Sequence, residues 1–139
     1  MGAILIGLAI FGYAEVRGAG WREFGRNDEE IRYYYAQDKK LSSYWLNESS
    51  EKIVRVWMKV EYTDKGLTER VQKLGKNYEN LKYTMIEEEI NCTDKKWRNS
   101  SSHDYSKEGK VIYSSSRASA WKPIESGSMT ETLRKALCK

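Results

Sequence analysis

Hydrophobic and polar residues alternate most clearly between Ile53 and Tyr62. One face carries only apolar or aromatic side chains: Val54, Val56, Met58, Val60 and Tyr62. The other carries mainly charge: Arg55, Lys59 and Glu61, with Trp57 among them. Alternation with a period of two is typical of an antiparallel strand buried on one face. The same pattern recurs in 81–92, so we expect two long strands, 53–62 and 81–92.

Shorter segments predict the remaining elements. Strands are expected at 21–25 and 31–35, joined as a hairpin, and at 97–105 and 111–116 on either side of a hairpin turn at 106–110. Residues 36–51 predict a short helical turn followed by a polar loop, and 121–124 an extended link. Leu67, Val71 and Leu74 have helical spacing before Gly75, which predicts a short helix over 67–74.

The chain closes with a predicted helix over 128–137. Ser128 and Glu131 have the spacing of a capping box. An apolar stripe follows at helical spacing: Met129, Leu133, Ala136 and Leu137. This stripe has to be buried against the strands, so the expected fold is α+β, with an antiparallel sheet of about five or six strands packed against a C-terminal helix.

Glu88 interrupts the apolar face of the second long strand. Its neighbours on that face are Ile86 and Ile90. Two interpretations remain open from the sequence: Glu88 marks an edge of the sheet, or it forms an ion pair with Arg55 or Lys59.

The first twenty residues predict a signal peptide. An apolar run over 2–14 is shorter than the roughly 20 residues that span a bilayer, and small residues follow it. Cleavage after Ala14 or after Gly20 fits the small-residue pattern. We favour Gly20 because Trp21 begins the first strand, which leaves one domain over 21–139 and no stable membrane span.

Charge excludes one class of partner. The chain holds 24 Lys and Arg against 20 Asp and Glu, a net charge of +4. Residues 21–139 keep this value, because residues 1–20 contain one base, Arg17, and one acid, Glu15. A dedicated nucleic-acid binder would show a clustered basic face, so we expect no nucleic-acid partner.

Cys92 and Cys138 are the only cysteines. In an exported chain two cysteines predict one disulfide. This bridge closes a loop of about 47 residues, which stabilises the fold by about 4 kcal/mol in the chain-entropy model. Two cysteines and the single His103 are too few for a tetrahedral metal site without acids, so we expect no metal.

Several short segments, taken in order, resemble the surface-adhesin protein E family: 53–57, 62–66, 89–92, 109–114, 121–124 and 133–139. The resemblance covers nearly all of 21–139. It implies an exported bacterial protein with a small antiparallel sheet and a C-terminal helix held by the disulfide. The family's namesake is a surface adhesin that binds host matrix proteins.

No residues predict catalysis or a cofactor. His103 lies between Ser102 and Asp104, but neighbours on a strand point to opposite faces, which argues against a triad. Glu87 and Glu89 share a face about 7 Å apart, and we interpret them as part of a solvated, ion-paired surface.

One segment combines basic charge with an aromatic anchor: Lys95, Lys96, Trp97 and Arg98. We place the candidate binding surface here. The alternative is an ordinary charged hairpin turn in which Trp97 packs inward. The sequence therefore predicts an exported, non-enzymatic binding protein resembling surface adhesin E, whose partner is a matrix protein or another surface protein. The alternative is an envelope module that binds an exported protein of the same cell. Outer surface, periplasm and medium all remain open as locations, and no oligomeric state is predicted.

Overall fold

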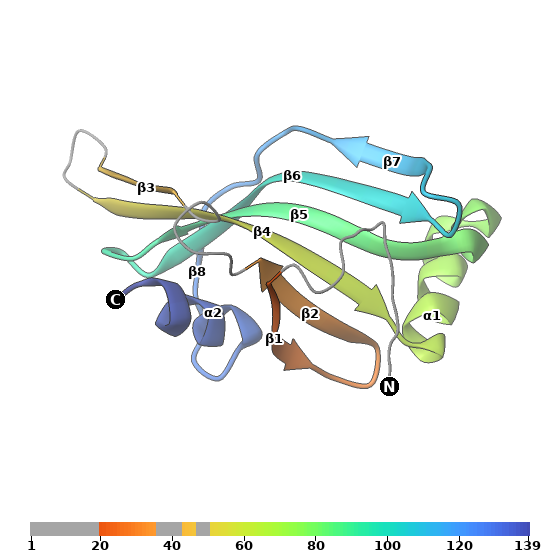
Figure 1. Ribbon diagram of the computed structural model, residues 1–139, viewed down its shortest axis with the longest axis horizontal. Helices are drawn as coiled ribbons and strands as arrows, with labels where there is room; N and C mark the ends of the chain where they lie inside the picture. Colours follow the sequence, from red (N-terminus) through yellow and green to blue (C-terminus); the bar gives the residue numbers. More distant parts are fainter. Residues whose placement is uncertain (1–19, 36–42, 47–50) are drawn as a thin grey trace.

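The computed structural model describes residues 20–35, 43–46 and 51–139. These residues form eight strands, two α-helices and one short 3-10 helix (Figure 1). The strands are β1 (Trp21–Arg26), β2 (Glu30–Tyr35), β3 (Ser43–Leu46), β4 (Lys52–Tyr62), β5 (Leu81–Asn91), β6 (Lys96–Ser106), β7 (Val111–Ser115) and β8 (Lys122–Pro123). The helices are α1 (Asp64–Leu74), η3 (Lys76–Asn80) and α2 (Met129–Leu137).

All strands belong to one antiparallel sheet, with the main order β1-β2-β4-β5-β6-β7. β4 pairs with β2 along residues 58–62 and with β3 along residues 52–55. β6 likewise pairs with β7 along residues 102–105 and with β8 along residues 96–97. The long strands β4, β5 and β6 therefore form the centre, and the predicted α+β fold is confirmed.

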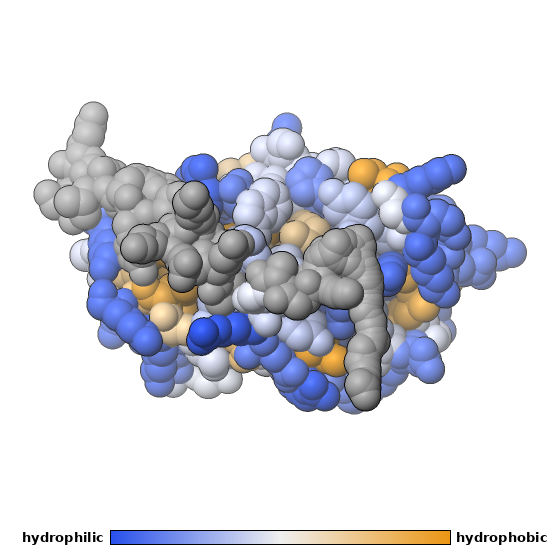
Figure 2. Space-filling view, viewed as in Figure 1, coloured by the Kyte–Doolittle hydropathy of each residue, from blue (hydrophilic) through white to orange (hydrophobic). Residues whose placement is uncertain are grey.

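The core lies on one face of the central strands, as the alternation predicts. Its strand residues are almost fully buried: Val54, Val56, Met58, Val60, Ile86 and Ile90. Leu133 and Leu137 of α2 complete the same cluster. In the view of Figure 2 the described surface is mainly hydrophilic, and its hydrophobic areas are small and separated. Apolar burial therefore concentrates beneath α2 and leaves a polar exterior in this view.

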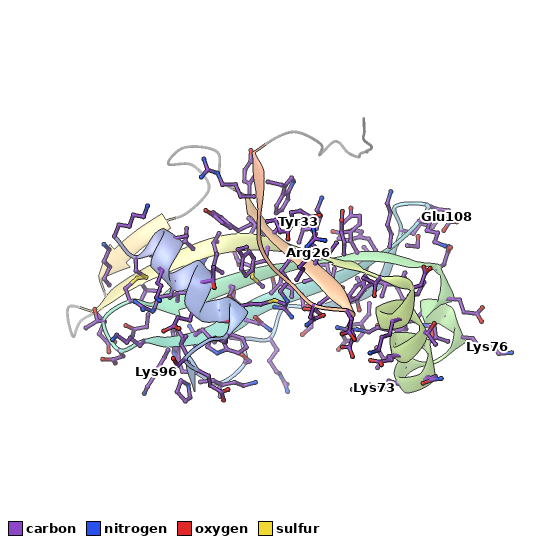
Figure 3. The ribbon with its side chains drawn as sticks, turned by 90° about the horizontal axis from the view of Figure 1, so that it is seen from below. Arg26, Tyr33, Lys73, Lys76, Lys96 and Glu108 are labelled. Carbon is purple, nitrogen blue, oxygen red and sulfur yellow. A yellow bond between two sulfur atoms is a disulfide. The ribbon has the colours of Figure 1, made fainter. Side chains whose placement is uncertain are left out.

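α2 is short, and three features hold it in place. The Ser128 side chain accepts a hydrogen bond from the Glu131 N–H at 3.1 Å, which confirms this half of the predicted capping box. The Glu131 carboxylate accepts the Gly127 N–H at 2.9 Å, and this bond lowers the pKa of Glu131. A disulfide joins Cys92 to Cys138, with 5.7 Å between their Cα atoms, as predicted. α2 and the β1–β2 hairpin cover the same face of the sheet (Figure 3).

α1 begins three residues earlier than the predicted start at Leu67, because Thr63 caps it: the Thr63 hydroxyl accepts the Gly66 N–H at 3.1 Å. Gly66 is buried against the β1–β2 turn, where a Cβ at this position would lie only 2.0 Å from the Glu29 carbonyl oxygen. The absence of a side chain therefore lets the helix approach the hairpin.

The sheet has two short strands that the sequence pattern did not predict. β3 lies within the segment predicted as a helical turn and loop, and β8 lies within the predicted extended link. Both are too short to show a period of two, and both depend on partners distant in sequence. Residues 36–42 and 47–50 of the predicted helical turn and loop, and residues 1–19 of the predicted signal peptide, lie outside the described residues.

Bulges interrupt the ladder at several points. Phe24 is an extra residue in β1 opposite β2, and Ile112 is an extra residue in β7 opposite β6. In the centre, Ser100 of β6 is inserted where Glu87 pairs with Ser101 and Glu88 pairs with Asn99. A bulge bends its strand and changes the local twist.

Candidate functional site

The predicted basic segment forms the turn and the first residues of the β5–β6 hairpin. Lys95 occupies the turn with a φ of 56°, and its side chain is exposed. Lys96 begins β6 and is also exposed. The carbonyl of Lys95 accepts the Ile124 N–H at 3.0 Å, which brings the segment around β8 beside the hairpin.

Trp97 and Arg98 point to opposite faces, as neighbours on a strand must. Trp97 packs partly buried against the core cluster, and the Lys122 ammonium lies 5.3 Å from the centre of its ring. Arg98 lies on the face opposite to the core, so the four predicted residues do not form one continuous surface.

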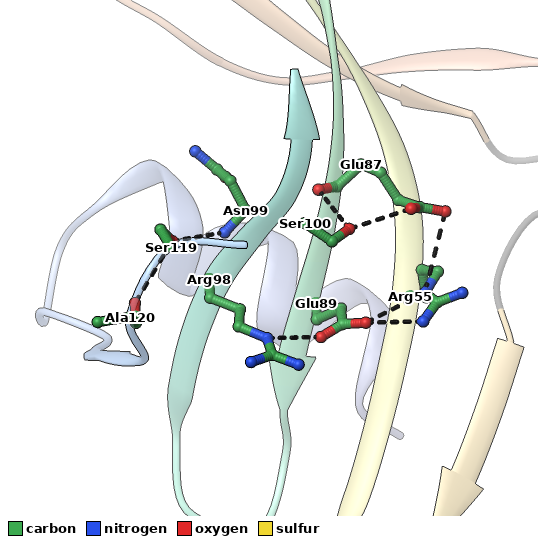
Figure 4. A network of polar contacts seen from close by, with 8 residues as sticks. All are labelled: Arg55, Glu87, Glu89, Arg98, Asn99, Ser100, Ser119 and Ala120. Carbon is green, nitrogen blue, oxygen red and sulfur yellow. Dashed lines mark hydrogen bonds and ion pairs between the residues drawn. The ribbon is translucent and has the colours of Figure 1, made fainter. Parts of the chain in front are cut away.

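Arg98 is held between a buried carboxylate and an aromatic ring. Its Nε donates to Glu89 Oε1 at 2.7 Å, and its guanidinium lies 4.5 Å from the centre of the Trp121 ring. The Glu89 side chain is only 4% exposed, and its Oε2 accepts from Arg55 Nη2 at 2.9 Å (Figure 4). Glu89 thus bridges two arginines, and Trp121 orients the second through a cation–π contact.

Glu87 joins the same network and does not act with Glu89 as a free acid pair. The two carboxylates do share a face, as predicted. Ser100 donates to Glu87 Oε1 at 3.0 Å, and Arg55 Nε lies 3.9 Å from Glu87 Oε2 (Figure 4). Both carboxylates are therefore engaged by cations or hydroxyls, which suits a structural ion-pair network.

His103 and Asp104 have different hydrogen-bond partners. His103 Nδ1 shares a hydrogen bond with the Ser114 hydroxyl at 2.5 Å. Asp104 is buried, where it accepts from the Tyr78 hydroxyl at 2.9 Å and from the Thr84 hydroxyl at 2.6 Å. Burial first, and then the hydrogen bond to Asp104, raises the pKa of Tyr78 to about 12. Asp104 thus fastens η3 to the sheet and does not orient His103.

Both interpretations of Glu88 are wrong. β5 lies inside the sheet, with β4 and β6 on either side, so Glu88 does not mark an edge. Arg55 is the cross-strand partner of Glu89, and Lys59 is the cross-strand partner of Met85. Both bases therefore lie on the face of the sheet opposite to Glu88. Glu88 instead faces the core and is 1% exposed.

Two residues of the site were not predicted from the sequence. Trp121 and Lys122 were interpreted as part of a link, yet they contact Arg98 and Trp97 respectively. The sequence signal for this contact is that both segments contain a tryptophan followed by a base, Trp97-Arg98 and Trp121-Lys122. It gains meaning only when β8 is known to pair with β6.

The basic segment lies at one end of the molecule. Figure 3 shows Lys96 at the end where α2 lies, and Lys73 and Lys76 at the far end beside α1 and η3. Within the described ranges, no three or more His, Cys, Asp or Glu residues are grouped so as to hold a metal ion. No helix in the described part of the chain is long and apolar enough to cross a membrane.

The structure is thus a disulfide-tied α+β domain that carries ion-paired arginines and two partly exposed tryptophans, Trp97 and Trp121, at one end. The model of the surface-adhesin protein E family matches residues 21–139. The chain therefore belongs to the surface-adhesin protein E family, and the predicted resemblance is confirmed. No curated protein and no solved structure matches the chain.

Proposed function

We propose that this protein is an exported, non-enzymatic adhesin-like module that binds an acidic protein surface, either of the extracellular matrix or of a cell surface. Residues 1–20 act as its signal peptide and 21–139 as its binding domain. Membership of the surface-adhesin protein E family supports the adhesive role. The polar network at one end of the sheet supports the location of the contact.

The proposed contact surface is the basic edge, defined as Lys95, Lys96, Arg98, Trp121 and Lys122. It includes both faces of the end of the β6–β8 pair, because Lys122 lies over Trp97 and Arg98 lies over Trp121 on the opposite face. Pairing of β6 with β8 brings its two segments together, with Lys96 opposite Pro123 and Trp97 opposite Lys122. Lys95, Lys96 and Lys122 are exposed, so their charges are available to steer an acidic partner.

The fixed and partly exposed guanidinium of Arg98 is the observation that supports this proposal. Its side chain is 33% exposed, and its Nε is already fixed by the buried Glu89. Among the described residues, none accepts a hydrogen bond from its two terminal nitrogens. A guanidinium held on one side by a carboxylate and on its face by Trp121 is preorganised to donate two parallel hydrogen bonds to a carboxylate of the partner.

The test measures binding of oxidised residues 21–139 to immobilised laminin and vitronectin across a salt series. Lys96→Glu/Lys122→Glu removes two positive charges from the basic edge and adds two negative ones. We expect Kd to rise at least tenfold for a protein that is bound through this edge, because charges in contact retain their attraction at a Debye length of about 8 Å. Circular dichroism checks that the variant is folded.

Lys73→Glu/Lys76→Glu is the matched control, because it makes the same change in net charge at the opposite end of the molecule (Figure 3). It should change Kd less than twofold. Equal losses in both variants would show attraction by net charge alone and would contradict the basic edge. Absence of saturable binding to either matrix protein, with a cell-envelope protein of the same organism captured through the basic edge, would favour the envelope module instead.

A further inference from the structure

One buried acid of the core has a carboxylate oxygen without a hydrogen-bond partner among the described residues. Glu88 is 1% exposed on the face that α2 covers, and its Oε1 has no hydrogen-bond partner among the described residues. Burial in this apolar surrounding raises the pKa of Glu88 to about 7, against the opposing effect of the positive charge on Arg32. An ionised carboxylate here would lack the donors that a buried anion requires.

A second unpartnered acceptor belongs to the residue directly opposite Glu88 on the next strand. Asn99 of β6 is the cross-strand partner of Glu88, next to the bulge at Ser100. The Asn99 Oδ1 atom is also buried and also has no hydrogen-bond partner among the described residues. Two buried acceptors without a donor are costly, and because these two belong to cross-strand partners, a single proton on Glu88 could satisfy both.

The surrounding elements do not provide a free counter-charge. On β2, Arg32 is itself bound by Glu30. On β4, the residue opposite Glu88 is the apolar Val56. The ion pairs of the other elements on this face are formed within each element: Glu131 with Arg134 on α2, and Glu23 with Arg26 on β1. Protonation is therefore the simplest way to satisfy Glu88.

We propose that Glu88 and Asn99 form a buried proton site, in which protonated Glu88 donates through Oε1 to Oδ1 of Asn99. The proton comes from solvent as the pH falls and returns to it as the pH rises. The neutral pair closes the bulge between β5 and β6, and the ionised pair loosens it.

The proton site connects to the basic edge through the backbone of Asn99. The Asn99 N–H donates to the Ser119 hydroxyl at 3.0 Å (Figure 4), and the Asn99 carbonyl accepts the Ser119 N–H at 2.8 Å. Trp121, two residues further on, carries the ring that lies against Arg98. A shift of the Asn99 backbone should therefore also shift Ser119 and change the position of Trp121. Its meaning for adhesion rests on the proposed function, whereas the proton site itself does not.

The sign of the pH dependence follows from the raised pKa. The folded protein binds the proton of Glu88 more tightly than the unfolded chain, whose glutamates have the ordinary pKa of about 4.5. The resulting stabilisation is complete below about pH 4.5 and is lost as the pH rises through about 7. We therefore expect the free energy of unfolding to be higher at mildly acidic pH than at neutral pH.

The test is a carbon-13 NMR titration of the glutamate side-chain carboxyls in oxidised residues 21–139, between pH 4 and pH 9. The Glu88 signal is assigned by its loss in Glu88→Gln, whose amide can donate to Asn99 as the protonated acid does. We expect a midpoint near pH 7 for Glu88, and the Trp121 indole N–H signal should move with the same midpoint. In Glu88→Gln the Trp121 signal should not move over this range.

The urea midpoint provides a second readout, without a binding partner. It should fall between pH 5 and pH 8 in the wild type and fall less in Glu88→Gln. A Glu88 midpoint at or below pH 4.5 would overturn the proton site, and would indicate that the Asn99 amide is turned to donate to an ionised carboxylate. A midpoint near 7 with an unmoved Trp121 signal would overturn the connection to the basic edge. Neither result depends on whether the protein binds a matrix protein.

Discussion

Removal of the disulfide tests how α2 is held on the sheet. Cys92 and Cys138 are separated by 46 positions, and cross-links of this span stabilise a domain by about 4 kcal/mol by restricting the unfolded chain. α2 has only nine residues, fewer than an isolated helix needs in water. Without the bridge it depends on its cap and on the burial of Leu133 and Leu137. Cys92→Ala/Cys138→Ala should therefore lose about 4 kcal/mol of unfolding free energy.

The assay is urea unfolding at 25 °C, followed by circular dichroism and by tryptophan fluorescence. The comparison uses the extrapolated free energy and not the midpoint alone, because the unfolded variant is less restricted and exposes more surface, which raises the m-value. Reduced wild type is the control and should match the double variant. A loss below about 1 kcal/mol, with both probes agreeing, would refute the loop-entropy reasoning and would show that packing alone holds α2.

Two further predictions use the same unfolding assay. Leu133→Ala should cost about 3 kcal/mol, because Leu133 is 0% exposed and its removal leaves a cavity, whereas Leu74→Ala, at a residue 47% exposed, should cost less than about 0.5 kcal/mol. Similar costs for the two leucines would contradict the assigned core. Gly66→Ala should cost about 2 kcal/mol, because its methyl group would lie 2.0 Å from the Glu29 carbonyl oxygen and force α1 away from the hairpin. An unchanged stability would mean that this contact is absent in solution.

The long elements could be predicted from sequence because their patterns repeat. β4 alternates from Val54 onward, and the predicted apolar face supplies all of its buried residues except Ile53. The α2 stripe and its Ser128 cap are equally local signals. Two cysteines allow only one intramolecular pairing, so the disulfide followed without knowledge of the fold.

The features that the sequence did not predict depend on contacts between residues that are distant in sequence. Trp121 contacts Arg98 only because β8 returns to β6, and a two-residue strand has no period to detect. Glu88 was expected at an edge or in an ion pair with Arg55 or Lys59, because an unpaired charge is costly in a core. Its burial beside Asn99 becomes apparent only when the order of the strands is known.

The bulges in the outer strands have a consequence for how copies of the domain behave when crowded. Phe24 in β1 and Ile112 in β7 each break the regular spacing of backbone groups along a strand at the end of the main sheet order. An approaching edge from another molecule would meet only a few evenly spaced donors and acceptors before the bulge. Such edges resist edge-to-edge joining into fibres. Many copies could therefore stand close together and still act as separate units.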